Sequence, residues 1–99
     1  MITSKQRAYL RGMANGLSPI FLIGKEGVSD TLISQLSLAL NARELIKVKI
    51  LETALLDTKQ TANEIAERLG AHCIQVIGSK FVLYRRAAKK ENRKIELPR

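Results

Sequence analysis

The chain has 99 residues, 45% of them hydrophobic, which is enough for one compact core and too few for two. Seventeen Lys and Arg residues outnumber nine Asp and Glu residues, so the formal net charge is +8. The single cysteine excludes an intrachain disulfide, and no apolar run approaches the roughly 18 residues of a membrane helix. The charged start has no apolar run after it, so we expect no signal peptide. These features predict a cytoplasmic protein with no role at a membrane and a polyanionic partner, most commonly nucleic acid.

The start of the chain predicts a helix followed by a short strand. Thr3 and Gln6 fit a capping box, and the helix that they begin should run to about Ala14. Residues 20–23 should then form a strand. Because this strand is apolar at every position, we expect it to be covered on both faces.

A Gly-Lys-Glu-Gly sequence at residues 24–27 connects this strand to a second predicted helix, which Ser29 can cap. A loop before a helix offers unpaired backbone N–H groups and the positive end of the helix dipole to an anion. Glycine lets a phosphate approach the backbone, and Lys25 adds a positive charge, whereas Glu26 opposes binding unless it points outward. Two glycines are also what an ordinary turn needs, so both interpretations stay open.

The rest of the chain predicts two strands flanking a third helix, and then a final strand. Residues 45–51 alternate, with Lys47 and Lys49 opposite the apolar side chains. A third helix should end at Gly70, and strands at residues 72–77 and 80–86 should form a hairpin. The order α-β-α-β-α-β-β predicts an α/β domain with a four-stranded mixed sheet and packed helices.

We assign residues 1–87 to this domain and residues 88–99 to a basic, flexible C-terminal tail. Residues 80–99 hold eight basic and two acidic residues, a net charge of +6. Such a tail can be a solvated end, an electrostatic binding arm or both, and the sequence does not distinguish these possibilities.

Enzyme chemistry finds little support in the sequence. His72 and Cys73 are neighbours in a predicted strand and point to opposite faces, so they form neither a nucleophile–base pair nor a two-ligand metal site. There is no P-loop and no G-x-G-x-x-G motif. We therefore expect no enzymatic activity, no cofactor, no metal and no small-molecule substrate.

Aromatic residues are few. Tyr9 and Phe21 lie on apolar segments and are predicted to be core residues. Phe81 and Tyr84 should lie on opposite faces of the last strand, so at most one of them is a platform for stacking RNA bases.

Taken together, the segments KQRAYLRGMA, PIFLIGKEGVSD, RELIKVKI and QVIGSKFVLYRR resemble the YhbY-like family, also called the chloroplast RNA splicing and ribosome maturation (CRM) domain. The resemblance covers nearly the whole chain and implies an RNA-binding domain with a fold similar to the C-terminal domain of translation initiation factor three. It also implies association with precursors of the large ribosomal subunit. The family's glycine loop corresponds to residues 24–27, and the resemblance assigns nothing to the tail.

Our hypothesis is therefore a non-enzymatic RNA-binding protein of ribosome assembly that contacts large-subunit ribosomal RNA or its precursor particles. The candidate RNA-binding residues are those of the glycine loop and basic residues elsewhere, and not all of them can share one face: Gly24, Lys25, Glu26, Gly27, Lys5, Arg7, Arg11, Lys47, Lys49, Lys80, Arg85 and Arg86. Two alternatives remain, a non-specific DNA-binding protein of the nucleoid and a protein–protein adaptor on the ribosome.

Overall fold

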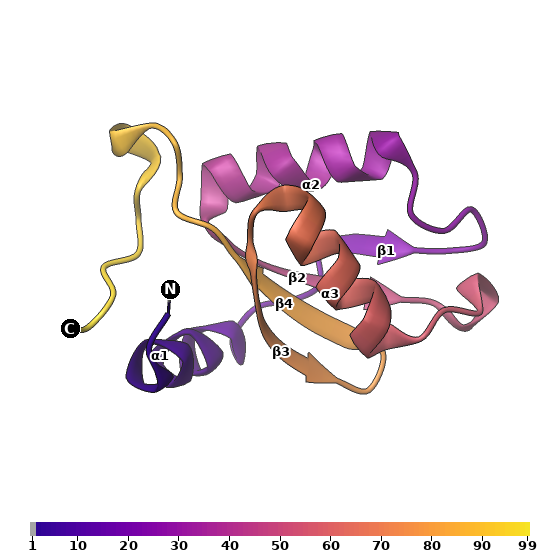
Figure 1. Cartoon of the computed structure of the whole chain (residues 1–99), viewed down its shortest axis with the longest axis horizontal. Coiled ribbons are helices and arrows are strands. Elements are labelled where there is room, and N and C mark those ends of the chain that lie inside the picture. The colour runs from indigo at the N-terminus through magenta and orange to yellow at the C-terminus, as the bar shows by residue number, and fades with distance from the viewer. Residues whose placement is uncertain (1) are drawn as a thin grey trace.

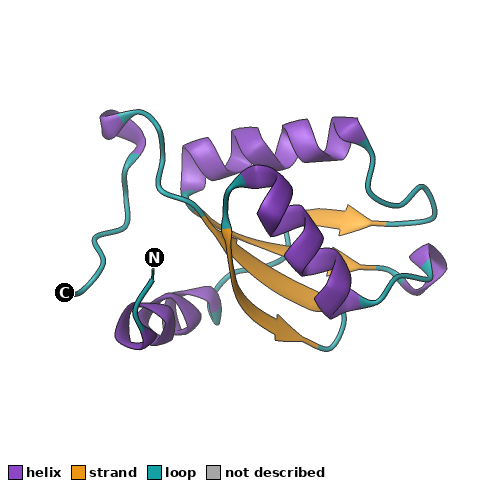
Figure 2. Ribbon diagram, viewed as in Figure 1, coloured by secondary structure: helices purple, strands orange, loops and turns teal. Residues whose placement is uncertain are grey.

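The computed structural model describes residues 2–99 as three helices and a four-stranded sheet, with two short 3₁₀ turns (Figures 1 and 2). The predicted element order and fold class are confirmed. In chain order the elements are α1 (Ser4–Ala14), β1 (Phe21–Ile23), α2 (Asp30–Arg43), β2 (Leu45–Ile50), η1 (Glu52–Ala54), α3 (Thr58–Leu69), β3 (His72–Ile77), β4 (Lys80–Tyr84) and η2 (Lys90–Asn92).

Each long helix begins at a side-chain cap. The capping box at α1 is formed, since the Gln6 backbone N–H donates to Thr3 Oγ1 and the Thr3 N–H donates to Gln6 Oε1, both at 3.1 Å. Ser29 Oγ accepts from the backbone N–H of Leu32 at the start of α2, and Asp57 caps α3. These bonds satisfy backbone donors that a helix start leaves free.

The sheet has the strand order β1-β2-β4-β3. β1 and β2 are parallel and are joined by α2, whereas β4 is antiparallel to both of its neighbours. The last strand therefore inserts between β2 and β3. As a result, the second strand–helix–strand unit joins strands that are parallel but not adjacent.

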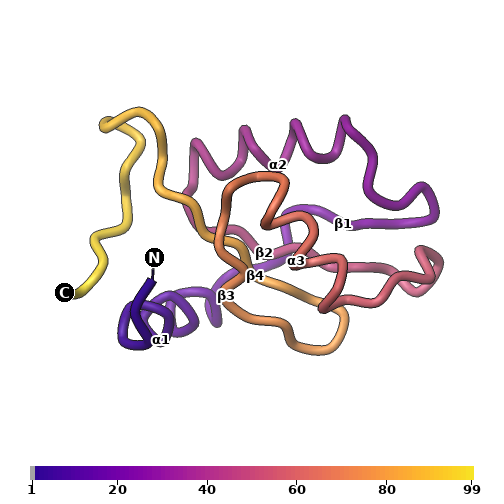
Figure 3. Tube along the Cα trace, viewed as in Figure 1, coloured from indigo at the N-terminus to yellow at the C-terminus, as the bar shows by residue number. Residues whose placement is uncertain are grey.

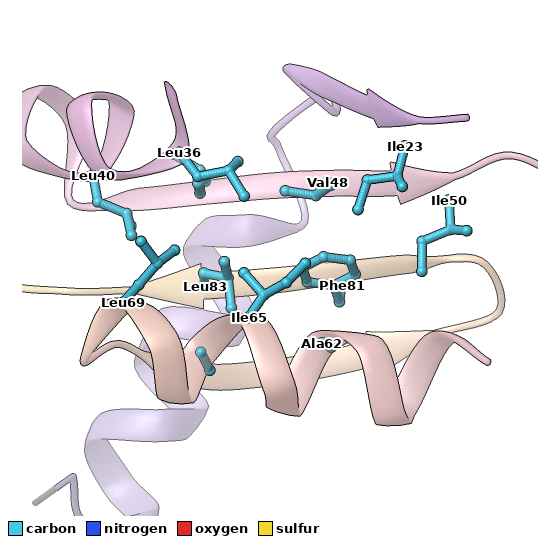
Figure 4. Close-up of a cluster of buried hydrophobic side chains, with 12 residues drawn as sticks. Ile23, Leu36, Leu40, Val48, Ile50, Ala62, Ile65, Leu69, Phe81 and Leu83 are labelled. Carbon is cyan, nitrogen blue, oxygen red and sulfur yellow. The ribbon is translucent and has the colours of Figure 1, made fainter. Parts of the chain in front are cut away.

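The two faces of the sheet carry separate apolar clusters. On one face, α2 and α3 pack on Val48, Phe81 and Leu83, as Figure 4 shows. On the other face, α1 packs through Leu10 and Ala14 on Leu45, Val82 and Tyr84. Because α1 is the one helix that residues 2–99 place on this face, it covers only part of it.

The expectation that β1 is covered on both faces is wrong. Leu22 is 59% exposed, while Ile23 is buried under the helices. β1 lies at the edge of the sheet, and α1 does not reach its outer face. A strand whose residues are all apolar is therefore, in this protein, an edge strand that is covered on one face only.

Residues 88–99, for which the sequence predicts a flexible tail, contact the folded domain at several points. The fully buried carboxylate of Glu44 accepts three backbone N–H groups of this segment or its start: Ala87 at 2.9 Å, Lys94 at 2.6 Å and Ile95 at 2.9 Å. Ile95 and Leu97 pack against the α1 cluster, and Gln6 Nε2 donates to the Pro98 carbonyl at 2.9 Å. The chain therefore folds back along α1 and ends beside its first turn (Figure 3).

Glu44 holds its charge in this buried position through hydrogen bonds. Burial opposes ionisation, but the three backbone donors, with the nearby charge of Arg86, outweigh it and lower the pKa of Glu44 below its ordinary value. The backbone of Glu44 is left-handed, with φ +66°, where α2 passes directly into β2. The same residue thus turns the chain and anchors its C-terminal segment.

Acid should release the C-terminal segment. Because the pKa of Glu44 is lowered in the folded chain, its stabilising contribution is fully present above the ordinary glutamate pKa of about 4.3 and is lost as the pH falls through the lower folded value. We expect the amide NMR signals of Ala87, Lys94 and Ile95 to keep their positions down to about pH 5 and to move together below it. In Glu44→Gln this shared transition should be absent, and its persistence there would assign it to another carboxyl group.

Candidate nucleic-acid interface

The glycine loop, residues 24–27, is a tight turn whose polar tip faces solvent. The backbone N–H of Gly27 donates to the Gly24 carbonyl at 2.9 Å, and Lys25 and Glu26 are both exposed between them. Gly27 has φ +71°, and a Cβ built there would meet no atom within 4 Å. The glycine is therefore needed for its backbone conformation, and the space beside it is open to a ligand.

The start of α2 is a weaker anion site than the sequence predicts. Ser29 already takes the N–H of Leu32, and Asp30 adds a carboxylate to the first turn. That carboxylate pairs with Arg68 at 3.0 Å, the only ion pair among residues 2–99. Positive charge for an anionic partner must therefore come chiefly from Lys25 and its neighbours on the sheet.

Three lysines, which we call the lysine face, project from the part of the sheet that α1 leaves uncovered: Lys47 and Lys49 on β2 and Lys80 on β4. Lys49 pairs in register with Lys80. The row they form ends in Leu22 on one side and Ile77 on the other. Because β1 continues directly into the glycine loop, this row is the one nearest the loop.

The lysine face is shallow and mixed in character. A pocket of about 170 Å³ lies there, lined by Lys47, Lys80, Gln75, Ile77 and Val82, with Asn15 at the end of α1. Ile77 is 60% exposed. Since no ion pair among the described residues involves these lysines, their charges are available to a partner.

Arg7 and Arg85, which the sequence predicts to bind RNA, donate hydrogen bonds to other parts of the protein. Arg7 donates from Nη1 to the Cys73 carbonyl at 2.6 Å and to the Ile74 carbonyl at 3.2 Å, at the irregularity in β3. Arg85 donates from Nη1 to the Leu69 carbonyl and from Nη2 to Ser37 and Asn41. Because their guanidinium groups hold α1 to the sheet and α2 to α3, we expect both residues to act in the fold rather than in RNA binding.

The other candidate residues lie away from the glycine loop. Lys5 and Arg11 are on α1, which packs on the same face of the sheet as the lysines. Arg86 follows β4 and lines a pocket with the C-terminal segment. Lys49 and Lys80 therefore lie in the row nearest the loop, and Lys47 lies farther from the loop in a cavity with Arg43. Lys5, Arg11 and Arg86 lie elsewhere.

The aromatic residues offer little stacking surface, and one prediction about them is wrong. Tyr9, predicted to be core, is 44% exposed. Phe81 and Tyr84 are both buried, so neither is available to a base. Tyr84 stacks on His72 with ring centroids 6.4 Å apart.

His72 and Cys73 lie in β3 and are half-buried. Burial lowers the pKa of His72, and the charge of Arg7 acts in the same direction. Burial raises the pKa of the Cys73 thiol. Both shifts favour the neutral forms, and residues 2–99 contain no group of three His, Cys, Asp or Glu side chains placed to hold a metal. No helix in the same range is long and apolar enough to cross a membrane.

Comparison with known proteins identifies the family. The model of the CRS1 / YhbY (CRM) domain matches residues 2–85. The chain belongs to this family. This match confirms the resemblance found in the sequence. It ends at residue 85, before the C-terminal segment.

Relatives match over the whole chain. The Bacillus subtilis protein YqeI, named as a probable RNA-binding protein, is 44% identical, and the alignment covers 99% of this chain and all of YqeI. An RNA-binding protein of Haemophilus influenzae is 38% identical, with 99% of this chain and 96% of that protein aligned. The solution structure of SAV1595 from Staphylococcus aureus, 40% identical, superposes with a TM-score of 0.75 over 99% of this chain and all of that one.

The reassignment of Arg85 is testable against its neighbour. Arg85→Met should lower the free energy of unfolding by about 2–3 kcal/mol, because it removes the charged hydrogen bonds that link Leu69 at the end of α3 to Ser37 and Asn41 of α2. Arg86→Met should lower it less, by up to about 1 kcal/mol, because Arg86 is exposed and loses only its attraction to the charge of Glu44. Urea unfolding of the two variants measures both values, and equal effects would contradict a structural role for Arg85.

Proposed function

We propose that this protein binds RNA through the glycine loop and the lysine face. The observation that carries the proposal is that Lys47, Lys49 and Lys80 share the uncovered face of the sheet, with Lys49 and Lys80 in the row nearest the exposed glycine loop and its Lys25. No carboxylate is paired to any of these lysines among the described residues. Family membership and the names of the relatives support RNA as the polyanion.

The chemistry of this surface favours phosphate contacts over base reading. Lysine is a point charge that attracts phosphate without fixing its orientation, and the open space at Gly27 lets a phosphate approach the loop backbone. Phosphate contacts position an RNA but do not specify its sequence. Specificity would then come from the shape of the folded RNA, which suits a structured partner.

We further propose that the partner is large-subunit ribosomal RNA or its precursor, bound in the cytoplasm during ribosome assembly without catalysis. The resemblance to stand-alone bacterial CRM proteins supports this assignment. The names of the relatives, which refer to RNA binding, support a binding role.

A matched pair of loop variants tests the RNA site. Gly27→Asp and Gly27→Asn have nearly the same shape and share the same φ of +71°, which Asp and Asn tolerate better than other side chains. Only Asp adds a negative charge, so we expect it to weaken RNA binding by at least about 1 kcal/mol more than Asn, or about fivefold. Filter binding at one salt concentration measures the difference, and circular dichroism checks that both variants fold.

Equal affinities for the two variants would remove the glycine loop from the interface. Competition between a structured ribosomal RNA and duplex DNA in the same assay addresses the nucleoid alternative. If DNA competes as well as RNA, the surface is a general polyanion site and the assignment to RNA fails.

The ribosomal assignment has its own test in cells. A tagged protein should sediment with precursors of the large subunit in a sucrose gradient, and ribonuclease treatment should release it because its contacts are to phosphate. Lys49→Ala should shift towards the top of the gradient, whereas Lys59→Ala, which removes the same charge from an exposed position on α3, should not. Retention on ribosomal proteins after ribonuclease treatment would instead favour the adaptor alternative.

A further inference from the structure

The C-terminal segment, residues 87–99, lies at the end of the molecule opposite to the glycine loop. Figure 1 shows the loop and this segment at the two extremes of the longest axis, along which the molecule extends 39 Å. Arg43, at the end of α2, lies between the two basic regions, because it lines one cavity with Lys47 and another with Lys94. An RNA contact made by the C-terminal segment would therefore lie at the far end of the molecule from the glycine loop.

The segment is held by its backbone and its apolar side chains, and this leaves its charges outside. Glu44 binds the N–H groups of Ala87, Lys94 and Ile95, while Ile95 and Leu97 pack inward. Arg93 braces the bend by donating from Nε to the Ala87 carbonyl at 3.0 Å. The basic residues of the segment and the residue before it are exposed: Arg86, Lys89, Lys90, Arg93, Lys94 and Arg99.

Basic side chains line two cavities around this segment. One cavity, of about 490 Å³, is lined by Arg86, Arg93 and Lys94, with Glu96 as its single acidic residue. The other, of about 280 Å³, places Lys94 beside Arg43 from the end of α2. Among residues 2–99 none of these four cations has an ion-pair partner. We call Arg43, Arg86, Arg93 and Lys94 the C-terminal surface.

We propose that the C-terminal surface is a second RNA-contacting surface, so that one protein molecule bridges two RNA segments. The proposal rests on the proposed function at the glycine loop and adds to it. Charge complementarity indicates RNA here as well, since the C-terminal surface is basic, unpaired and built on a fixed backbone. An RNA that reaches both ends gains the second contact at high effective concentration, whereas a short RNA gains only one.

Energy transfer between two RNAs tests bridging directly. Short RNAs of about 8 nucleotides, one batch with a donor dye and one with an acceptor, should show energy transfer when the wild-type protein is added. Arg43→Gln/Lys94→Gln should reduce that signal at least tenfold while the affinity for a single short RNA changes by less than about threefold. Gly27→Asp should also abolish energy transfer. Lys59→Gln, which lines neither surface, should leave it unchanged.

Glu44→Gln separates a docked surface from a flexible arm. This change raises the net charge by one and keeps every basic residue, but it replaces an acceptor carboxylate by an amide that cannot accept all three N–H donors. A docked surface predicts weaker bridging in Glu44→Gln, whereas a flexible electrostatic arm predicts bridging that is equal or stronger. The Arg43→Gln/Lys94→Gln variant retains the clamp and so tests the charges even if Glu44→Gln unfolds.

The outcomes distinguish this inference from the proposed function. If the wild type binds a short RNA in a manner that Gly27→Asp weakens, but shows no energy transfer, the bridging proposal is overturned and the loop site stands. Energy transfer that survives Arg43→Gln/Lys94→Gln would also overturn it. If the wild type binds no RNA, both proposals fail together.

Discussion

The alternation of side chains along β2 sets the arrangement of the whole molecule. Every second residue of this central strand is apolar and buried under α2 and α3, and the residues between them must emerge on the opposite face. One of these, Leu45, is covered by α1, whereas Lys47 and Lys49 are not. A one-residue shift of β2 would bury both lysines, so the core that holds the fold also fixes where the charge appears.

The first helix, α1, divides the second face of the sheet into a covered half and an open half. By packing Leu10 and Ala14 on one half of the second face, α1 leaves the half next to the glycine loop open. The covered half receives the returning C-terminal segment through Ile95 and Leu97. One face of the sheet therefore provides an apolar seat for the two ends of the chain and a basic surface beside the loop.

Most of the fold could be predicted from the sequence because it depends on local patterns. The capping box at Thr3, the alternation of β2 and the Gly78–Ser79 turn each act over a few residues. The roles of Glu44, Arg7 and Arg85 could not be predicted, because their partners lie far along the chain and are mostly backbone carbonyl or N–H groups. A backbone group has no sequence signature, so a charged residue that binds one is indistinguishable from a solvated one. The same reason explains why the sequence predicts a flexible tail: its hydrogen-bonding partners, Glu44 and Gln6, lie more than forty residues earlier in the chain.

The position of β4 between β2 and β3 has a consequence for how the chain folds. The β3–β4 hairpin closes over a two-residue turn, which is a fast local event, whereas the pairing of Leu45 with Tyr84 must bring distant parts of the chain together. Until the hairpin docks on β2, β2 can pair only with the three residues of β1. The C-terminal segment follows β4 directly, so it reaches Glu44 only after β4 is in place. The pairing of β2 with β4 is therefore the step expected to limit the folding rate, and the C-terminal segment is expected to dock last, after synthesis of the chain is complete.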